Sequence, residues 1–312
     1  MPIPADKIAI IVPTIGRRDD LRRMLGSLAE QSRPPDQVVI VDENGEGNAL
    51  ARMFPHLNIR VTTFPRGSAS AKRNRGFQCA DAEINLIAFM DDDIVVEPPA
   101  IEAMLNFWKT APEDVGGASC NWMNQPPLFA SNLKSLPLVS RLGLYDSRGG
   151  LVMRSGFQTV LGMASETRYV QWLPSGAVVY RRRILEEYCF DEWFGGYSYL
   201  EDLDFSYTLS KRFRLAVVAS ARFHHYPSSV GRINPFVFGK REVTNRLYFV
   251  RKHAELSPAL CCVALSIRAM ISTFLGLTKF EGAYFQRAWG NIVGLVSVAT
   301  HGTEAMALHE KT

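Results

Sequence analysis

Two groups of carboxylates in this 312-residue chain have the spacing that chemistry on a charged substrate requires. The first, Asp91 to Asp93, directly follows the apolar run Ile84 to Met90, which predicts a buried strand. Alternation along an extended chain would point Asp91 and Asp93 to one side and Asp92 to the other. Two carboxylates on one side suit Mg²⁺ or Mn²⁺, which stabilises the negative charge of a diphosphate leaving group. The alternative interpretation is an acidic turn without a ligand.

The second group lies at the start of a predicted helix. Glu201 and Asp202 open this helix, and free backbone N–H groups stabilise carboxylates there, so helix capping is one interpretation. The other is that one carboxylate, best Asp202, accepts a proton from an incoming hydroxyl. Asp204 could take either role.

Two consecutive histidines follow the next predicted strand. A neutral imidazole from His224 or His225 could complete a manganese site built mostly from carboxylates, and a structural histidine is the alternative. Because neighbouring residues of a strand face opposite ways, we expect at most one of the two in the site.

Two weaker signals suit a phosphate or a sugar. The small-residue segment Gly67 to Gly76 could offer backbone N–H groups and Arg73 to an anion, although a capped, solvated helix has the same pattern. Trp172 with Ser175 and Gly176 could form a sugar platform, although a tryptophan is more often a core residue.

Alternating strands and helices must position these groups. The predicted strands are Lys7 to Val12 (stopping at Pro13), Gln37 to Val41, Ile59 to Phe64 and Ile84 to Met90. Helices between them predict an α/β fold with a parallel sheet, at whose carboxyl edge Thr14, Asp42 and the aspartate triplet should converge. The turn after the first strand lacks a GxGxxG sequence, and no Walker A motif is present, which argues against dinucleotide and P-loop sites.

The remainder of the chain divides into a loop and a basic tail. The segment Asn121 to Arg168 has no sustained period and is predicted to be a variable loop over the site. Residues 232–287 carry nine Lys and Arg against three acids, although the net charge of the whole chain is only +4. We therefore expect a domain at 1–231 and a basic, apolar helical extension at 232–312.

The five cysteines form no ligand or disulfide pattern, and the first apolar run is shorter than a signal-peptide core, so a cytoplasmic location is expected. Apolar runs at 258–278 and 292–299 could pack on the core or lie on an anionic membrane surface. Arg268 argues against a spanning helix. Contact through residues 232–299 would place the protein at the cytoplasmic face and suit a lipid-linked acceptor.

Taken in order, these pieces resemble the family 2 glycosyltransferases, inverting sugar-nucleotide enzymes of the GT-A fold, over Ile8 to about His225. The matching segments are Ile11-Val-Pro-Thr14, Val39-Ile-Val-Asp42, Ala69-Ser-Ala-Lys-Arg-Asn-Arg-Gly76, Phe89-Met-Asp-Asp-Asp93, Trp172-Leu-Pro-Ser-Gly-Ala177, Phe190-Asp-Glu192 and Tyr199-Leu-Glu-Asp-Leu-Asp204, with His224 beyond. The resemblance implies a Rossmann-like, mostly parallel sheet flanked by helices, with a C-terminal helical extension.

The resemblance also implies roles for single residues. Pro13, Thr14 and Asp42 match positions that hold the base and ribose, although Glu43-Asn44 departs from the family pattern after the last of them. The residues expected to contact the nucleotide sugar are Pro13, Thr14, Asp42, Arg73, Asp91, Asp92, Ser175 and Gly176. The residues expected to hold Mn²⁺ or Mg²⁺ are Asp93 as the direct ligand, Asp91 and His224. The residues expected to be catalytic are Asp202 as the base and Glu201.

These expectations combine into one reaction. The hydroxyl of a glycan or lipid-linked acceptor, deprotonated by Asp202, attacks the anomeric carbon of a nucleoside-diphosphate sugar, with inversion. Arg232, Lys240 or Arg241 could close over the diphosphate, and no nucleic-acid partner is expected. The alternatives are a non-catalytic nucleotide-sugar or glycan-binding protein and, less favoured for want of a glycine-rich, arginine-containing loop after the first strand, a sugar-nucleotide pyrophosphorylase.

Overall fold

The computed structural model describes residues 6–126, 140 and 143–309, and its chain divides into two compact units. The first comprises Met1–Pro127, Leu161–Glu192 and Phe205–Gly231, and the second Leu128–Val160, Trp193–Asp204 and Arg232–Thr312. Two segments of the second unit, Leu128–Val160 and Trp193–Asp204, precede the extension expected at 232–312. Their backbones bind the C-terminal helices there, as when Arg246 donates to the Gly156 carbonyl and Asn245 to the Tyr199 carbonyl.

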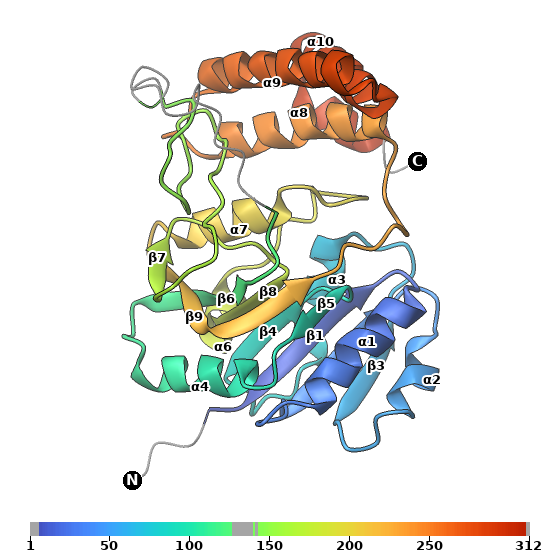
Figure 1. Ribbon diagram of the computed structural model, residues 1–312, viewed down its shortest axis with the longest axis vertical. Coiled ribbons are helices and arrows are strands. Elements are labelled where there is room, and N and C mark those ends of the chain that lie inside the picture. The colour runs from blue at the N-terminus through green and yellow to red at the C-terminus, as the bar shows by residue number, and fades with distance from the viewer. Residues whose placement is uncertain (1–5, 127–139, 141–142, 310–312) are drawn as a thin grey trace. The chain divides into compact units, whose positions relative to one another are not determined.

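A nine-stranded mixed sheet forms the centre of the first unit (Figure 1). The strands are β1 (Ile8–Thr14), β2 (Gln37–Asp42), β3 (Ile59–Thr63), β4 (Leu86–Met90), β5 (Ile94–Val96), β6 (Val115–Trp122), β7 (Arg168–Val170), β8 (Ala177–Arg181) and β9 (Arg214–His225). Their order is β3-β2-β1-β4-β8-β6-β9-β5, with β7 also paired to β9. The helices of this unit are α1 (Arg18–Ala29), α2 (Gly47–Ala51), α3 (Ala69–Cys79), α4 (Ala100–Thr110), α6 (Arg182–Glu187) and the end of α7 (Glu201–Leu209).

The sheet is parallel only in its first half and between β6 and β9. Strands β3, β2, β1 and β4 pair in parallel, as expected, whereas β8 pairs antiparallel with both β4 and β6. The expectation that β1 stops at Pro13 is wrong, because Thr14 still pairs with Asp42. The missing N–H of proline is tolerated because the β4 ladder has already ended at Ile11.

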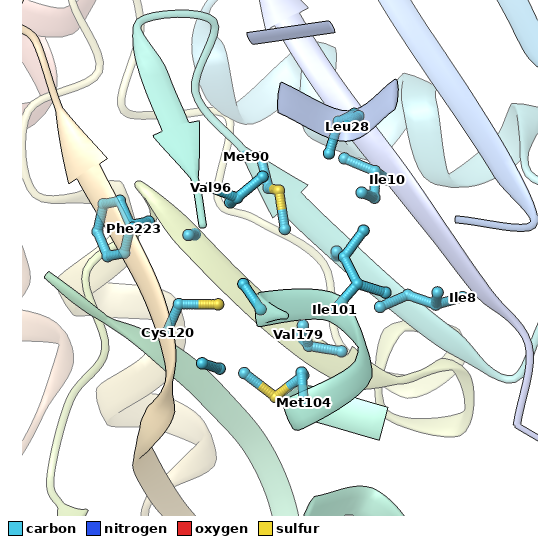
Figure 2. Packing of buried hydrophobic residues seen from close by; sticks show 14 of the residues in the cluster. Ile8, Ile10, Leu28, Met90, Val96, Ile101, Met104, Cys120, Val179 and Phe223 are labelled. Carbon is cyan, nitrogen blue, oxygen red and sulfur yellow. The ribbon is translucent and has the colours of Figure 1, made fainter. Parts of the chain in front are cut away.

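Each face of the sheet has its own apolar core. On one face, residues of β1, β4, β8 and β9 pack against Leu28 of α1 and against Ile101 and Met104 of α4 (Figure 2). On the other face, Phe205 of α7 stacks on Phe190 with ring centroids 4.2 Å apart. The continuously apolar strands are explained by this burial on both faces.

The irregular segment Asn121–Arg168 contains little regular structure where it is described: the end of β6, an isolated bridge between Val152 and Gln158, and Arg168, where β7 begins. Residues 127–139 and 141–142 of this predicted loop lie outside the described residues.

Three helices dominate the second unit: α8 (Pro235–Lys252), α9 (Pro258–Lys279) and α10 (Gly282–His309). Buried Glu242 of α8 accepts both hydrogen bonds of the Arg287 guanidinium, and Arg268 lies 3.6 Å away. Burial acts to raise the pKa of Glu242, but the arginine charges outweigh it and the pKa lies below its ordinary value. A buried ion pair therefore ties α8 to both later helices.

Candidate active site

The polar residues that close the parallel strands converge at the carboxyl edge of the sheet, as the sequence predicted. Thr14 and Asp42 are paired in register at the ends of β1 and β2, and both are buried. The Thr14 hydroxyl donates to Asp92 Oδ2 at 2.6 Å, which joins the end of β1 to the turn after β4. Three neighbouring parallel strands therefore deliver their polar ends to one place.

The aspartate triplet does not alternate as predicted. Strand β4 ends at Met90, so the three residues lie in a turn, where the alternation of a strand does not apply. Arg17 Nη1 lies 3.0 Å from Asp92 Oδ1 and 3.6 Å from Asp93 Oδ2, so these two carboxylates share one cation. Asp91 instead contacts Arg73, at 3.2 Å.

Asp92 is the most deeply buried carboxylate of the triplet. Burial raises its pKa to about 6, and the neighbouring carboxylates act in the same direction, while Arg17 and the Thr14 hydroxyl lower it in part. Because it is the most deeply buried of the three and its pKa is raised, we infer that it orders the site through Thr14 and Arg17 more than it binds metal.

This raised pKa predicts a pH-dependent stability. Between its ordinary pKa of 3.8 and the folded value of about 6, the folded protein binds more protons than the unfolded chain, so the unfolding free energy falls as the pH rises through this range. In metal-free buffer, wild type should lose about 2 kcal/mol relative to Asp92→Asn between pH 4 and 7. Chemical denaturation of both proteins across this range measures the difference, and parallel curves would contradict the raised pKa.

Asp93 is held as an anion by several donors. Its Oδ1 lies 3.0 Å from His225 Nε2, and its Oδ2 accepts the Ser228 N–H at 3.0 Å. Burial acts to raise the pKa of Asp93, but the hydrogen bonds from His225 and Ser228, with the charges of His225 and Arg17, outweigh it and hold the pKa below its usual value. An ionised carboxylate with an imidazole beside it is a donor pair for a divalent cation.

The two histidines face opposite ways, as predicted. Strand β5 pairs with β9 so that Ile94 is opposite His225 and Val95 is opposite His224. His225 reaches Asp93, whereas His224 Nε2 lies 3.1 Å from Glu97 Oε1. The geometry favours His225, rather than His224, as the histidine of the aspartate site.

A basic helix lies beside the triplet, as its small-residue start suggested. Ser68 caps α3, and its buried Arg73 donates to the Ser175 hydroxyl at 2.9 Å as well as contacting Asp91. The backbone N–H of Asp91 donates to the Gly176 carbonyl. The expected residues Arg73, Ser175 and Asp91 are thus neighbours, and Trp172 is buried like a core tryptophan.

Asp42 orders the loop that follows it. Its two oxygens accept backbone N–H groups from Asn44, at 3.0 Å, and Gly47, at 2.7 Å. The unusual Glu43 pairs with buried Lys72 at 2.6 Å, and the same ammonium donates to the Thr14 carbonyl. Glu43, the residue that departs from the family pattern, therefore has an ion-pair partner on α3.

Glu201 and Asp202 form the first turn of α7, where they belong to the second unit. Asp204, which could have shared their role, is buried. It contacts Lys252 Nζ at 2.7 Å and His253 Nε2 at 3.3 Å. Asp204 therefore anchors this turn to the end of α8. Asp202 is only half-buried, and its Oδ1 accepts the N–H of Leu203.

The backbone before this turn is strained. Ser198 and Leu200 have φ values of 45° and 77°, a region that costs a non-glycine residue on the order of 1–3 kcal/mol. Both residues are buried, so packing holds them in this conformation. Strain of this kind is concentrated at functional sites, which favours a function for the residues that follow.

Two parts of the site were not predicted from the sequence. Arg17 has no role among the residues expected from the sequence, yet it contacts two aspartates and donates to the Val230 carbonyl. Its position just after β1, at the edge where ligands bind, was the available signal. Lys72 lay inside the recognised segment, but nothing in the sequence showed that it would reach Thr14 and Glu43.

Within the described residues, no group of three or more His, Cys, Asp and Glu side chains is gathered closely enough to hold a metal by itself. Asp93 and His225 nevertheless provide an oxygen and a nitrogen donor, and Asp91 is the most exposed carboxylate of the triplet. Mg²⁺ usually takes one or two carboxylates from the protein and further oxygens from substrate phosphates and water. These residues therefore fit a cation that binds together with a diphosphate.

The model of the family described as Glycosyl transferase family 2 matches residues 9–189, more than half of the chain. The chain belongs to glycosyl transferase family 2. The matched region includes the aspartate triplet, Arg73 and Ser175, whereas Asp202 and both histidines lie beyond it.

Two curated glycosyltransferases are similar in sequence. The uncharacterized glycosyltransferase YibD of Escherichia coli (strain K12) is 27% identical over 122 residues, covering 37% of this chain and 34% of that protein. The uncharacterized glycosyltransferase YwdF of Bacillus subtilis (strain 168) is 32% identical over 107 residues, covering 34% of this chain and 39% of that protein. The chain thus matches less than two fifths of each relative's length.

Solved structures show the same fold. S. aureus TarS 1-349 in complex with UDP-GlcNAc has a TM-score of 0.56 at 17% identity, covering 91% of this chain and 78% of that one. Mannosyltransferase PcManGT from Pyrobaculum calidifontis, in complex with GDP-Man and Mn²⁺, has a TM-score of 0.55 at 15% identity, covering 96% of this chain and 89% of that one. The fold is of the GT-A type, as the resemblance implied.

Proposed function

We propose that this protein is an inverting glycosyltransferase that moves a sugar from a nucleoside-diphosphate sugar to a hydroxyl of a glycan or lipid-linked acceptor. The observation that carries the proposal is the anionic Asp93, fixed at the carboxyl edge of the sheet by His225, Ser228 and Arg17. Family membership and the nucleotide sugars bound by the two similar structures support the donor class.

The residues of the first unit would bind and orient the donor. Thr14 and Asp42 close the strands where the nucleotide would lie, and Arg73 with Ser175 offers donors to its phosphates or sugar. A Mn²⁺ or Mg²⁺ ion, held by Asp93 with His225 and Asp91, would supply positive charge to the departing diphosphate. Arg17 would add a fixed positive charge beside the same carboxylates.

Asp202 would act on the acceptor. An ionised carboxylate at a helix N-terminus can accept the proton of a hydroxyl as the oxygen attacks the anomeric carbon. The departing diphosphate takes the bonding electrons, and a single displacement inverts the configuration. Glu201, buried in the same turn, would help to position this base.

The two histidines provide a matched pair of variants. We expect His225→Ala to weaken the apparent Mn²⁺ affinity for donor binding by about 10- to 100-fold, because His225 either binds the ion or orients Asp93. His224→Ala, which removes the neighbour that faces Glu97, should change it by less than about twofold. Titration of Mn²⁺ at fixed donor concentration measures both, and a larger loss in His224→Ala would reverse the assignment.

Thermal shift with a panel of nucleotide sugars, with and without Mn²⁺, tests the donor site directly, because a ligand of the folded state raises Tm by mass action. A manganese-dependent shift with one nucleotide family, followed by transfer to an acceptor, is expected. Binding with no transfer to any acceptor would favour the non-catalytic binding protein, and turnover that depends on a sugar phosphate and a nucleoside triphosphate would favour the pyrophosphorylase.

A cytoplasmic location belongs to the same proposal. Its support is the pattern of the cysteines, none of which is paired within the described residues. A donor made in the cytoplasm would be available to the enzyme there.

A further inference from the structure

The α9–α10 hairpin of the second unit presents an unusually apolar outer face. On α9, large apolar side chains recur every three or four residues and are all exposed: Val263, Ile267, Met270, Phe274 and Leu277. On α10 the same spacing places a second exposed row: Phe285, Trp289, Ile292 and Val296. Spacing of this kind puts each row on one face of its helix.

The two rows lie beside each other. Helices α9 and α10 run side by side and both contact α8 (Figure 1). Phe285 of α10 packs so closely on Gly276 of α9 that a Cβ there would lie 2.9 Å from its ring. The exposed rows therefore lie on two helices that pack against each other, and apolar side chains gathered on a protein surface mark an interaction site.

The turn between the helices strengthens this conclusion. Phe280 is 92% exposed and has a φ of 54°, the left-handed region that a bulky side chain rarely adopts. Folding thus displays an aromatic ring at the tip of the hairpin instead of burying it. Lys279 precedes it and is also exposed.

The helix α9 is more apolar than its packing requires. Its mean hydropathy, 1.9 over 18 residues, would suit a membrane span by length and composition, yet only 28% of that window is buried. Its opposite face, which includes Cys261, Leu265 and Ala269, is the buried one. Arg268 also lies near buried Glu242 of α8, an arrangement that a spanning helix would break.

We propose that the outer face of the α9–α10 hairpin docks in the plane of an anionic lipid bilayer. From Pro258 to Thr303 the hairpin carries three basic residues, Arg268, Lys279 and Arg287, against one acid, Glu281. Anionic headgroups attract this charge while the apolar rows enter the acyl boundary. A second copy of the chain is the weaker occupant, because a symmetric contact would bring together two hairpins of the same net positive charge.

Vesicle flotation of the full chain tests this proposal, with vesicles of phosphatidylcholine alone and of phosphatidylcholine mixed with phosphatidylglycerol. We expect binding to the mixed vesicles that weakens as salt is added. The variant Phe274→Ser/Phe280→Ser should lower the partition coefficient by about a hundredfold, since two large apolar side chains no longer leave water. Lys279→Gln should lower it about fivefold, on the mixed vesicles only.

Met163→Ser is the matched control, because Met163 is as exposed as Phe274, at 63%, but belongs to the first unit. It should float like wild type, and unchanged thermal melts should show that every variant folds. Absence of flotation with either vesicle, or equal flotation of the double variant, would overturn the proposal. So would a stable dimer that the double variant dissociates without any lipid binding. Because the flotation assay contains no sugar donor, absence of lipid binding would not contradict the proposed glycosyl transfer.

Discussion

Asp202→Asn is expected to bind the nucleotide sugar with the affinity of wild type and to transfer it about 10²- to 10⁴-fold more slowly. The amide keeps the size of the carboxylate and can still accept the Leu203 N–H, so the first turn of α7 should persist. It cannot accept the acceptor proton at neutral pH, and that step is the role we assign to Asp202. Initial rates at saturating donor measure the transfer step, and thermal shift measures the donor affinity. Together they separate the two effects.

The control for this variant is Glu186→Gln, which removes an exposed carboxylate from α6 in the first unit. It should retain wild-type turnover. A further readout is the pH profile: the acidic limb of kcat should disappear in Asp202→Asn, because that limb reports the ionisation of the base. Turnover of the variant close to wild type would show that another group removes the proton.

Asp93→Ala should lower metal-dependent turnover by about a thousandfold. A cation at a developing diphosphate contributes several kcal/mol of transition-state stabilisation. Asp93 is a carboxylate of the triplet whose pKa the fold lowers, and it has a second donor, His225, beside it. The expected signature is loss of the manganese-dependent part of the donor thermal shift, with any metal-independent part retained. Mn²⁺ titrations of turnover and of thermal shift measure it.

Removal of Asp93 also leaves His225 and Arg17 without one of their contacts, so the stability of the variant must be measured together with its turnover. Asp93→Asn, which preserves the volume, gives a second variant that should fold and still lose metal dependence. Asp114→Ala, which removes an exposed carboxylate from the same unit, is the control. Full manganese dependence in Asp93→Asn would exclude Asp93 as a ligand.

Much of the sheet was predictable because its signal is local. Strands β1, β2 and β4 are runs of apolar residues, many of them β-branched, each closed by a polar residue, and a parallel sheet must bring such ends together. The antiparallel insertion of β8 was not predictable from its five residues, since a short apolar run carries no information about its direction.

The candidate site was predictable in its types of residue but not in all its partners. Asp92 and Asp93 share Arg17 because they lie in a turn, whereas the alternation rule assumed an extended chain. The choice of His225 over His224 depends on which residue of β9 faces β5, and that register depends on the pairing of two distant segments.

By itself the sequence determined the order of the elements, the carboxylates that could do chemistry and the apolar runs of the C-terminal region, because each follows from composition and spacing along a short length of chain. The tertiary structure decided which charges meet. Asp204 became an anchor through Lys252 and His253, and α9 kept an exposed apolar face, because both outcomes depend on contacts between residues far apart in the sequence.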